Sequence, residues 1–182
     1  MRKVLSLLFI LGMGITATAQ DSQIPNDTLV WRVNRPLVFD DFTGEPIESS
    51  NLMGEAFCLI LTTFERPVDS PYTEIGVQAV FDKTNSWISR RTRPDEMMLF
   101  QVTFNIFEVY ARKLRKEAQQ LRNDPFAQGT FQKKYAQSLP SLTFKCNELK
   151  RETRMGADKV KLQEWDEKVK MELKELEAYK QR

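Results

Sequence analysis

The sequence predicts an α+β fold: a small N-terminal antiparallel β-sheet, one long helix, and two or three further C-terminal helices. From about residue 29 to residue 88, apolar residues alternate or cluster in short β-rich runs, as they do in strands. From residue 94 onward they recur at steps of three and four, as on one face of a helix. Hydrophobic residues make up 41% and charged residues 29% of the chain, which is ordinary for a globular domain. We therefore expect a single α+β domain over residues 29–182.

The N-terminus has the three parts of a cleavable secretory signal. A short basic start precedes a mostly apolar run, residues 4–15, and the small residues Ala17 and Ala19 stand where a signal peptidase reads the chain. The apolar run is much shorter than the roughly 20 residues of a transmembrane helix. We expect residues 1–19 to be a signal peptide and residues 20–28 a short N-terminal segment, and we expect export to the periplasm or the medium.

Charge and histidine content exclude several classes of protein. The formal net charge is +2, and two basic residues of the signal account for it, so the remainder lacks the basic excess of a nucleic-acid-binding domain. The chain contains no histidine, which excludes Ser-His and Cys-His nucleophiles and histidine zinc sites. No apolar stretch after the signal is long enough to cross a bilayer. We expect no nucleic-acid partner and no membrane span in the mature chain.

The region that precedes the long helix predicts three or four strands. The candidate extended runs are residues 29–33, 37–39, 56–64 and 74–81. Residues 40–44, D-D-F-T-G, predict a turn, because aspartate side chains can bond to nearby backbone and glycine adopts unusual dihedral angles.

The long helix is predicted over residues 95–122. Pro94 and the two acidic residues after it suit a first helical turn, where the helix dipole favours negative charge. Proline breaks helices, so Pro140 predicts two separate helices, over residues 130–138 and 141–153.

The final helix is predicted after Gly156 and runs to about Tyr179. Its narrow apolar seam lies between charged positions and predicts packing against the domain. A coiled coil with a partner is the alternative, although the seam covers fewer than about four heptads.

Cys58 and Cys146 allow one intramolecular disulfide in an oxidising compartment, but the sequence leaves open whether they form it or are buried apolar side chains. Their spacing does not fit a C-x-x-C zinc site.

The segment 104–116, F-N-I-F-E-V-Y-A-R-K-L-R-K, resembles part of the helix of a family of secreted, largely uncharacterised bacterial proteins that are predicted zincin-like metallopeptidases. That helix typically reads H-E-x-x-H-F-D-I-x-E-x-Y-A-R-K-L-R-K. Residues 38–44, 81–87 and 152–165 are similar to further elements of the family. The resemblance spans most of residues 29–180 and implies a zincin-like α+β domain.

At four positions this chain departs from the family's chemistry. Leu99 stands where the first zinc histidine would be, Phe100 replaces the catalytic glutamate, and Thr103 replaces the second histidine. Met155 stands where the third ligand would be, in a segment that resembles the family's T-x-H-G. The resemblance therefore implies a degenerate member that lacks the metal ligands, so we expect no metal, no cofactor and no peptidase activity.

The replacements favour a packed interior in place of the site. A catalytic zinc ion needs three protein ligands and an open position for water. Leucine and phenylalanine have no lone pair to donate, and threonine and methionine are poor zinc ligands. We expect Leu99, Phe100, Phe104 and Met155 to fill the emptied cavity.

Glu108 and Arg112, also on the helix, are four residues apart. Between a leftover of the site and an ordinary helix ion pair, we favour the ion pair.

Three functions are compatible with these features. The first is a non-catalytic relative of zincin-like peptidases that serves as a binding or structural module of the cell envelope, with a polypeptide as a possible partner. The second is an envelope interaction protein that acts through the charged C-terminal helix. The third is a carboxylate-based hydrolase, for which Asp40 with Asp41, or Asp95 with Glu96, are the candidate pairs.

Overall fold

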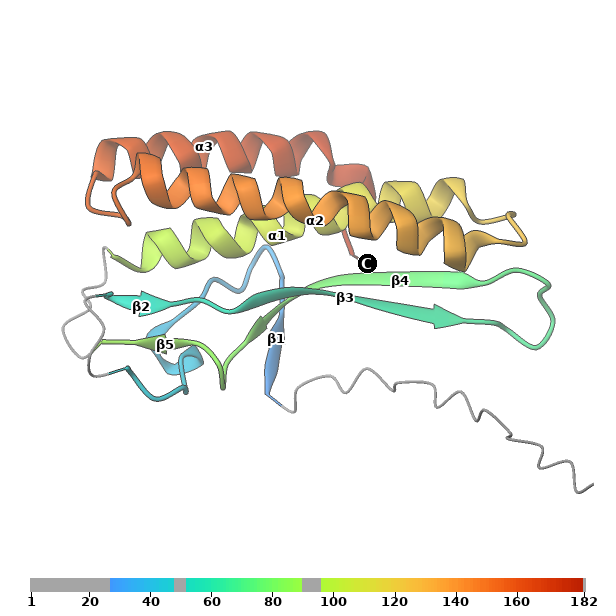
Figure 1. The fold of residues 1–182 in the computed structure, drawn as a ribbon, viewed down its shortest axis with the longest axis horizontal. Coiled ribbons are helices and arrows are strands. Elements are labelled where there is room, and N and C mark those ends of the chain that lie inside the picture. The colour runs from blue at the N-terminus through green and yellow to red at the C-terminus, as the bar shows by residue number, and fades with distance from the viewer. Residues whose placement is uncertain (1–26, 48–51, 90–95, 182) are drawn as a thin grey trace, which may run out of the picture.

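A computed structural model describes residues 27–47, 52–89 and 96–181. In this part the chain forms an α+β fold, with an antiparallel sheet on one side and three long helices on the other (Figure 1). The predicted signal peptide and the segment up to residue 26 lie outside the described residues, as does Asp95. Among the helices that are described, none is long and apolar enough to cross a membrane.

The main sheet has three antiparallel strands, with β4 (Glu74–Asp82) between β1 (Thr28–Val30) and β3 (Cys58–Glu65). The β3–β4 pairing covers all eight residues of β3, from Cys58 opposite Phe81 to Glu65 opposite Glu74. Two very short strands, β2 (Gly54–Glu55) and β5 (Trp87–Ile88), form a separate pair. The antiparallel sheet that the alternating pattern predicted is confirmed.

The run predicted as extended over residues 37–39 is instead the entry to a 3-10 turn, η1 (Phe39–Asp41). The carboxylate of Asp41 accepts the Val38 N–H at 2.9 Å and two hydrogen bonds from the Arg35 guanidinium, at 2.6 and 2.9 Å. Aspartate side chains stabilise turns by such local bonds. This local bonding, rather than strand pairing, fixes the backbone here.

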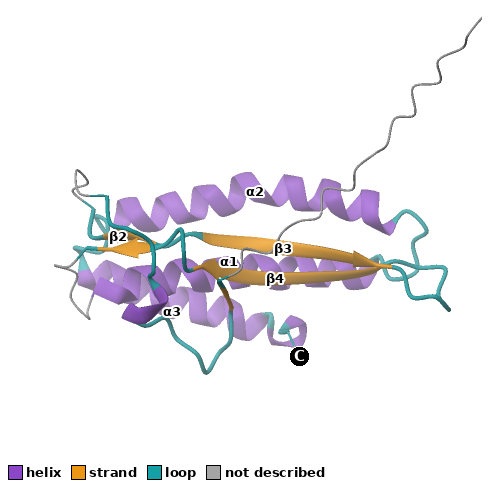
Figure 2. Ribbon diagram, turned by 90° about the horizontal axis from the view of Figure 1, so that it is seen from below, coloured by secondary structure: helices purple, strands orange, loops and turns teal. Residues whose placement is uncertain are grey.

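The helices are α1 (Met97–Gln120), α2 (Ala127–Glu152) and α3 (Lys159–Glu175), followed by a 3-10 turn, η3 (Glu177–Tyr179). Helix α1 contacts the sheet through β3 and β4 on one side and both α2 and α3 on the other, so it is the central element of the molecule. Figure 2 shows α2 running alongside β3, with α3 on the opposite side of α1.

The break predicted at Pro140 is wrong, because α2 continues through this residue. Pro140 has no N–H to donate to the preceding turn, so the carbonyl of Ala136 loses its helical partner. Both residues are exposed, so water can hydrate that carbonyl and the helix survives.

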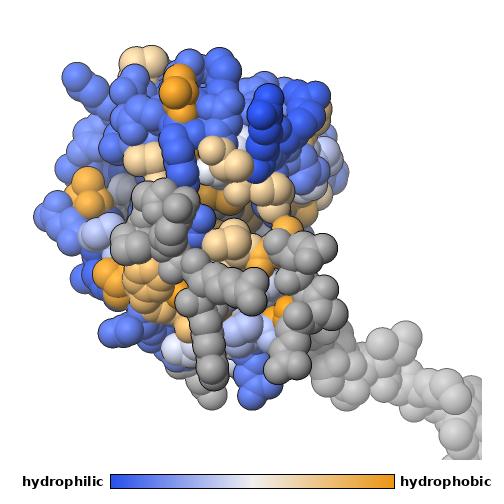
Figure 3. Space-filling view, turned by 90° about the vertical axis from the view of Figure 1, so that its left-hand side faces the viewer, coloured by the Kyte–Doolittle hydropathy of each residue, from blue (hydrophilic) through white to orange (hydrophobic). Residues whose placement is uncertain are grey.

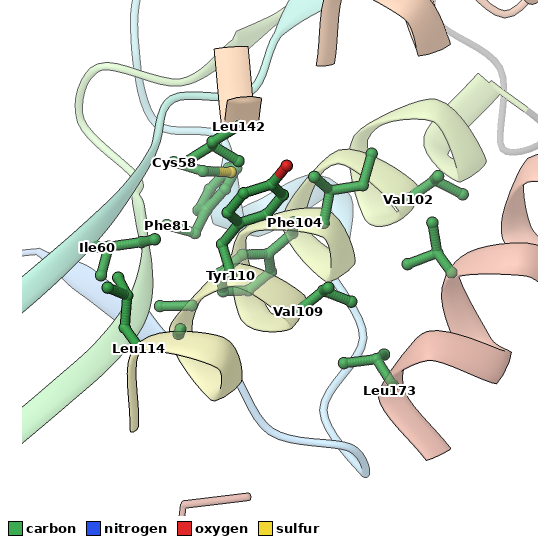
Figure 4. Close-up of a cluster of buried hydrophobic side chains, with 14 of the residues drawn as sticks. Cys58, Ile60, Phe81, Val102, Phe104, Val109, Tyr110, Leu114, Leu142 and Leu173 are labelled. Atoms are coloured by element: carbon green, nitrogen blue, oxygen red, sulfur yellow. The ribbon is translucent and has the colours of Figure 1, made fainter. Parts of the chain in front are cut away.

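The core lies where α1 meets the sheet. Figure 4 shows side chains from β3, α1 and α2 meeting there, with the ring of Tyr110 beside Cys58 and Leu142. Aromatic rings continue the core toward the start of α1: Phe42 lies 5.0 Å from Phe81, and Phe81 lies 5.9 Å from Phe104, between ring centroids. Edge-on and tilted pairs of this kind add to the stabilisation that burial provides.

Candidate functional site

The three helix positions that correspond to the H, E and H of the family's H-E-x-x-H lie in the first two turns of α1. Their side chains face inward: Leu99 is 7%, Phe100 5% and Thr103 7% exposed. In Figure 1 this part of α1 lies at the same end of the molecule as β2, β5 and the turn between α2 and α3.

Phe100, at the position that corresponds to the catalytic glutamate, is packed between an aromatic ring and a strand. Its ring centroid lies 5.2 Å from that of Phe42. On the other side, a Cβ added at Gly54 of β2 would lie only 2.9 Å from Cζ of Phe100 and 2.6 Å from the Trp87 carbonyl oxygen. The ring therefore occupies the space directly beside the β2–β5 pair, where only glycine fits.

Leu99 contacts the turn between α2 and α3, which carries Met155, the fourth of these positions. Gly156 has a φ of +87°, and a Cβ added to it would lie 3.3 Å from Cβ of Leu99. Thr153 holds this turn: its buried hydroxyl donates to the Leu149 carbonyl at 2.7 Å and accepts the Gly156 N–H at 3.1 Å. The fold thus brings the segment after α2 against the first turn of α1.

Met155 does not fill the interior, and the expectation that it would is wrong. Its side chain is 43% exposed, and its backbone is left-handed, with φ of 58°. Arg154 before it is also left-handed, with φ of 49°, so two consecutive non-glycine residues adopt an uncommon conformation. The Gly156 backbone, rather than the Met155 side chain, covers Leu99.

Thr103 bonds within its own helix. Its Oγ1 donates to the Leu99 carbonyl at 2.8 Å, which is the usual way for a buried threonine to satisfy its hydroxyl in a helix. Among the described residues, no group of three or more Cys, Asp or Glu side chains could hold a metal ion. Of the four positions, Leu99 and Phe100 form packed contacts, with Gly156 of the α2–α3 turn and with Gly54 of β2 respectively.

The surface at this end carries apolar side chains. Figure 3 views it directly and shows hydrophobic atoms gathered near its middle, between hydrophilic regions. The exposed apolar residues that border β2 and the α2–α3 turn are Ile47, Leu52, Met53 and Met155.

Glu108 and Arg112 are not the ordinary helix ion pair that we favoured. Both are almost fully buried, at 1% and 3% exposed, and Arg115 joins them. The Arg112 Nε donates to Glu108 at 2.9 Å, and the Arg115 guanidinium donates to both oxygens of the same carboxylate at 2.9 and 3.0 Å. Glu108 therefore pairs with two guanidinium groups inside the protein, and Glu177 adds a second carboxylate, 3.2 Å from Arg112.

The two arginines use their remaining donors to hold distant backbone. Arg112 donates to the Leu173 carbonyl at 2.6 Å, and Arg115 donates to the carbonyls of Val77 at 2.9 Å and Tyr179 at 3.0 Å. This polar cluster fastens β4 and the C-terminal segment to α1. Neither periodicity nor motif revealed it, because polar residues at helical spacing usually mark a solvent-facing side.

An open groove of about 570 Å³ lies over α1 between α2 and α3. No motif or periodicity in the sequence predicted it. Its lining includes Tyr110, Lys145, Trp165 and Glu172. Burial lowers the pKa of Lys145, although its hydrogen bond to Glu172 acts in the opposite direction. Burial raises the pKa of Tyr110, and the charge of Glu172 adds to that increase.

The two cysteines are free thiols in this structure. Burial raises the pKa of Cys146 to about 11, and it raises the pKa of Cys58 well above the ordinary value. Thiols are nucleophilic as thiolates, so both act here as small apolar side chains, Cys58 buried and Cys146 partly buried.

Of the two acidic pairs proposed for a hydrolase, the pair Asp95 and Glu96 lies partly outside the described residues, and Asp40 with Asp41 is not set up as an acid and a base. Burial raises the pKa of Asp41, but its hydrogen bonds from Arg35 and Val38 outweigh this effect, and the pKa is lowered overall. Asp40 beside it is exposed to solvent. A general acid at neutral pH needs a raised pKa, so this pair does not fit the role.

No protein-family model, no curated protein and no solved structure matches the chain. The resemblance of α1 to a zincin-like helix therefore stays a prediction from the motif.

Proposed function

We propose that this chain is an exported, non-catalytic relative of zincin-like metallopeptidases that serves as a binding or structural module of the cell envelope. The observation that carries the proposal is the contact of Leu99 with Gly156. A Cβ added at Gly156 would lie only 3.3 Å from Cβ of Leu99. Through this contact the segment that resembles T-x-H-G lies beside the turn of α1 where the family's helix has H-E-x-x-H. This is the relation that a three-ligand site on a zincin-like fold would need.

The chemistry of the four side chains supports loss of catalysis. A zinc ion activates water by lowering its pKa, and a nearby glutamate takes the proton. Leu99 and Phe100 offer no donor atom, and the Thr103 hydroxyl donates to a backbone carbonyl. Burying an apolar side chain of this size stabilises a fold by roughly 1.5–3 kcal/mol. The replacements thus favour stability in place of metal binding.

Restoring the ligands tests the proposal. The triple variant Leu99→His, Thr103→His and Met155→His should bind about one zinc ion per chain, measured by mass spectrometry of the dialysed protein, and zinc should raise its Tm. Two histidines at i and i+4 share a helix face, and the turn would supply the third ligand.

The matched control keeps the first two changes and replaces Met155→His by Arg154→His on the exposed neighbouring residue. This control should bind zinc at least tenfold more weakly. Equal zinc binding by the two variants would mean that position 155 does not face the helix positions. Stoichiometric zinc in the unmodified protein, or peptide cleavage that a chelator stops, would overturn the proposal itself.

The second candidate, an interaction protein that acts through the C-terminal helix, has less support. The apolar seam of α3 is buried against the domain, including Leu162, Val169 and Leu173. Its charged face remains open to solvent. Deleting residues 157–182 should give an insoluble product if α3 is needed for packing, whereas a soluble product that has lost a partner would favour the interaction role.

A further inference from the structure

The outer edge of β3 has a defined pattern of backbone groups. Asp82 donates its N–H to the Phe57 carbonyl at 2.9 Å, so in the β3–β4 register the odd-numbered residues of β3 bond to β4. Antiparallel ladders alternate, so the even-numbered residues direct their N–H and C=O groups away from β4. Tyr135 of α2 confirms this phase, because its hydroxyl donates to the Ile60 carbonyl at 3.3 Å.

Beyond Ile60 this edge is unpaired. Among the described residues, the outward N–H groups of Thr62 and Phe64 donate to no acceptor and their C=O groups accept from no donor. Strand edges of this kind are ready templates for another strand. Tyr135 closes the edge on one side, so the open stretch is short and begins at residue 61.

A groove of about 490 Å³ lies beside this stretch, between the end of β3 and the first turns of α2. Its lining includes Phe64, the exposed ring of Phe126, and the amides of Gln128 and Gln132, one helical turn apart. Gly129 also lines it, and a Cβ added there would meet nothing within 4 Å. The groove is therefore open space next to unpaired backbone, with apolar and amide surface on its far wall.

The charge that lines the groove is positive only. Arg66 is the one charged residue among the lining residues, which include no acid. It donates one hydrogen bond, to the Pro71 carbonyl at 3.1 Å, and keeps its positive charge without a carboxylate partner among the described ion pairs. An acidic side chain in an occupant would complement it.

We propose that the outer edge of β3 at Thr62 and Phe64, with the groove beside α2, binds an extended polypeptide segment that carries an acidic residue. The segment adds as a short strand: its backbone pairs with the outward groups of Thr62 and Phe64, its apolar side chains lie on Phe126, and its carboxylate lies near Arg66. The proposal gives a partner class to the non-catalytic module proposed above, and in that respect it rests on it.

Extended backbone fits this edge better than other occupants. A helix satisfies its own backbone groups and would leave those of Thr62 and Phe64 unpaired. A second copy offers only the same short stretch, since Tyr135 already bonds to the Ile60 carbonyl. In Figure 1 the end of β3 and the start of α2, which line the groove, lie at the opposite end of the molecule from the first turn of α1, so the two sites are separate.

The test uses a pool of capped pentapeptides of alternating Val and Thr with one Asp, added to the folded full-length mature chain. Binding should slow amide exchange at Thr62 and Phe64 at least tenfold by NMR, while the Thr63 amide, already paired with β4, stays unchanged. The same peptides N-methylated on the residues that face β3 should not bind, whereas methylation on the alternate residues should be tolerated.

Three variants sharpen the test. Thr62→Pro removes an outward N–H without breaking the β3–β4 ladder, and Gly129→Trp fills the groove; each should weaken binding at least tenfold. Gly129→Ala is the matched control and should bind as the unmodified chain does. Arg66→Gln should remove the preference for Asp over Asn peptides.

The proposal is overturned if no peptide of the pool protects these two amides, or if binding ignores N-methylation and Thr62→Pro. It is also overturned if the same amides are protected by self-association, seen by ultracentrifugation without peptide, since a second copy would then occupy the edge. Zinc binding by the restored variant is measured separately, so either result can fail alone.

Discussion

Glu108 is at the centre of the buried polar cluster of α1. Its carboxylate accepts hydrogen bonds from Arg112 and Arg115, and those arginines bind backbone carbonyls of β4 and of the C-terminal segment. Sequence reasoning found Glu108 and Arg112 as a pair but not their burial. Their spacing is the same for an exposed ion pair and for a buried one, and only the third partner and the distant carbonyls distinguish the two.

We expect Glu108→Gln to destabilise the protein by about 3–5 kcal/mol, because it removes the carboxylate that pairs with Arg115 and leaves the buried Arg112 with only the exposed Glu177 as counter-charge. Urea unfolding measures this change. Glu164→Gln is the control, since Glu164 pairs with Lys161 on the surface, with the two side chains 56% and 49% exposed. That change should cost less than about 1 kcal/mol, and similar losses for both variants would contradict the buried-cluster assignment.

Asp41 should make stability depend on acidity. Its folded pKa is lowered by Arg35 and by the Val38 N–H, which outweigh the effect of burial. A lowered pKa contributes stability that is present above the unfolded value of about 3.9 and is lost as pH falls through the folded value. Asp41→Asn should therefore flatten the loss of Tm below about pH 4, while Asp40→Asn on the exposed neighbour should not. A parallel loss in both variants would assign the acid sensitivity to other groups.

At the scale of elements, the spacing of apolar residues along the sequence predicted the helices and the main strands well. The long helix was expected over residues 95–122 and is observed as Met97–Gln120. The errors have local causes: a side-chain-bonded turn replaced one expected strand at Asp41, and an exposed proline was absorbed into α2. A sequence pattern cannot compare the free-energy cost of a proline inside a helix with the stabilisation that packing of the helix on either side of it provides.

Pro140 therefore offers a stability test. We expect Pro140→Ala to raise the free energy of unfolding by up to about 3 kcal/mol, because it restores one helical hydrogen bond and removes a steric clash. Pro125→Ala, in the loop before α2, should give no gain, because proline in a loop restricts the unfolded chain. Chemical denaturation followed by circular dichroism compares the two. A gain confined to the loop variant would mean that α2 depends on the proline.

At the scale of the whole molecule, composition and the spacing of apolar residues predicted the α+β class, which is confirmed. The motif resemblance predicted that Leu99, Phe100, Phe104 and Met155 would fill one interior; the first three are buried, but Met155 is exposed and the Gly156 backbone lies against Leu99 in its place. The β3 edge and the grooves beside α2 could not be predicted, because they depend on which strand lies outermost and on how far two helices separate. Those properties belong to tertiary packing, and no local pattern encodes them.

The hydrogen bonds from Arg112 and Arg115 to the C-terminal segment also have a consequence for synthesis of the chain. Arg112 donates to the Leu173 carbonyl, and Arg115 donates to the Tyr179 carbonyl as well as to that of Val77. Until a ribosome has released that far stretch, a growing chain lacks the acceptors that would let those charges leave water. The contact of these arginines with the C-terminal segment therefore forms only after Leu173 and Tyr179 have been made, and a chain that stops short of them lacks both acceptors.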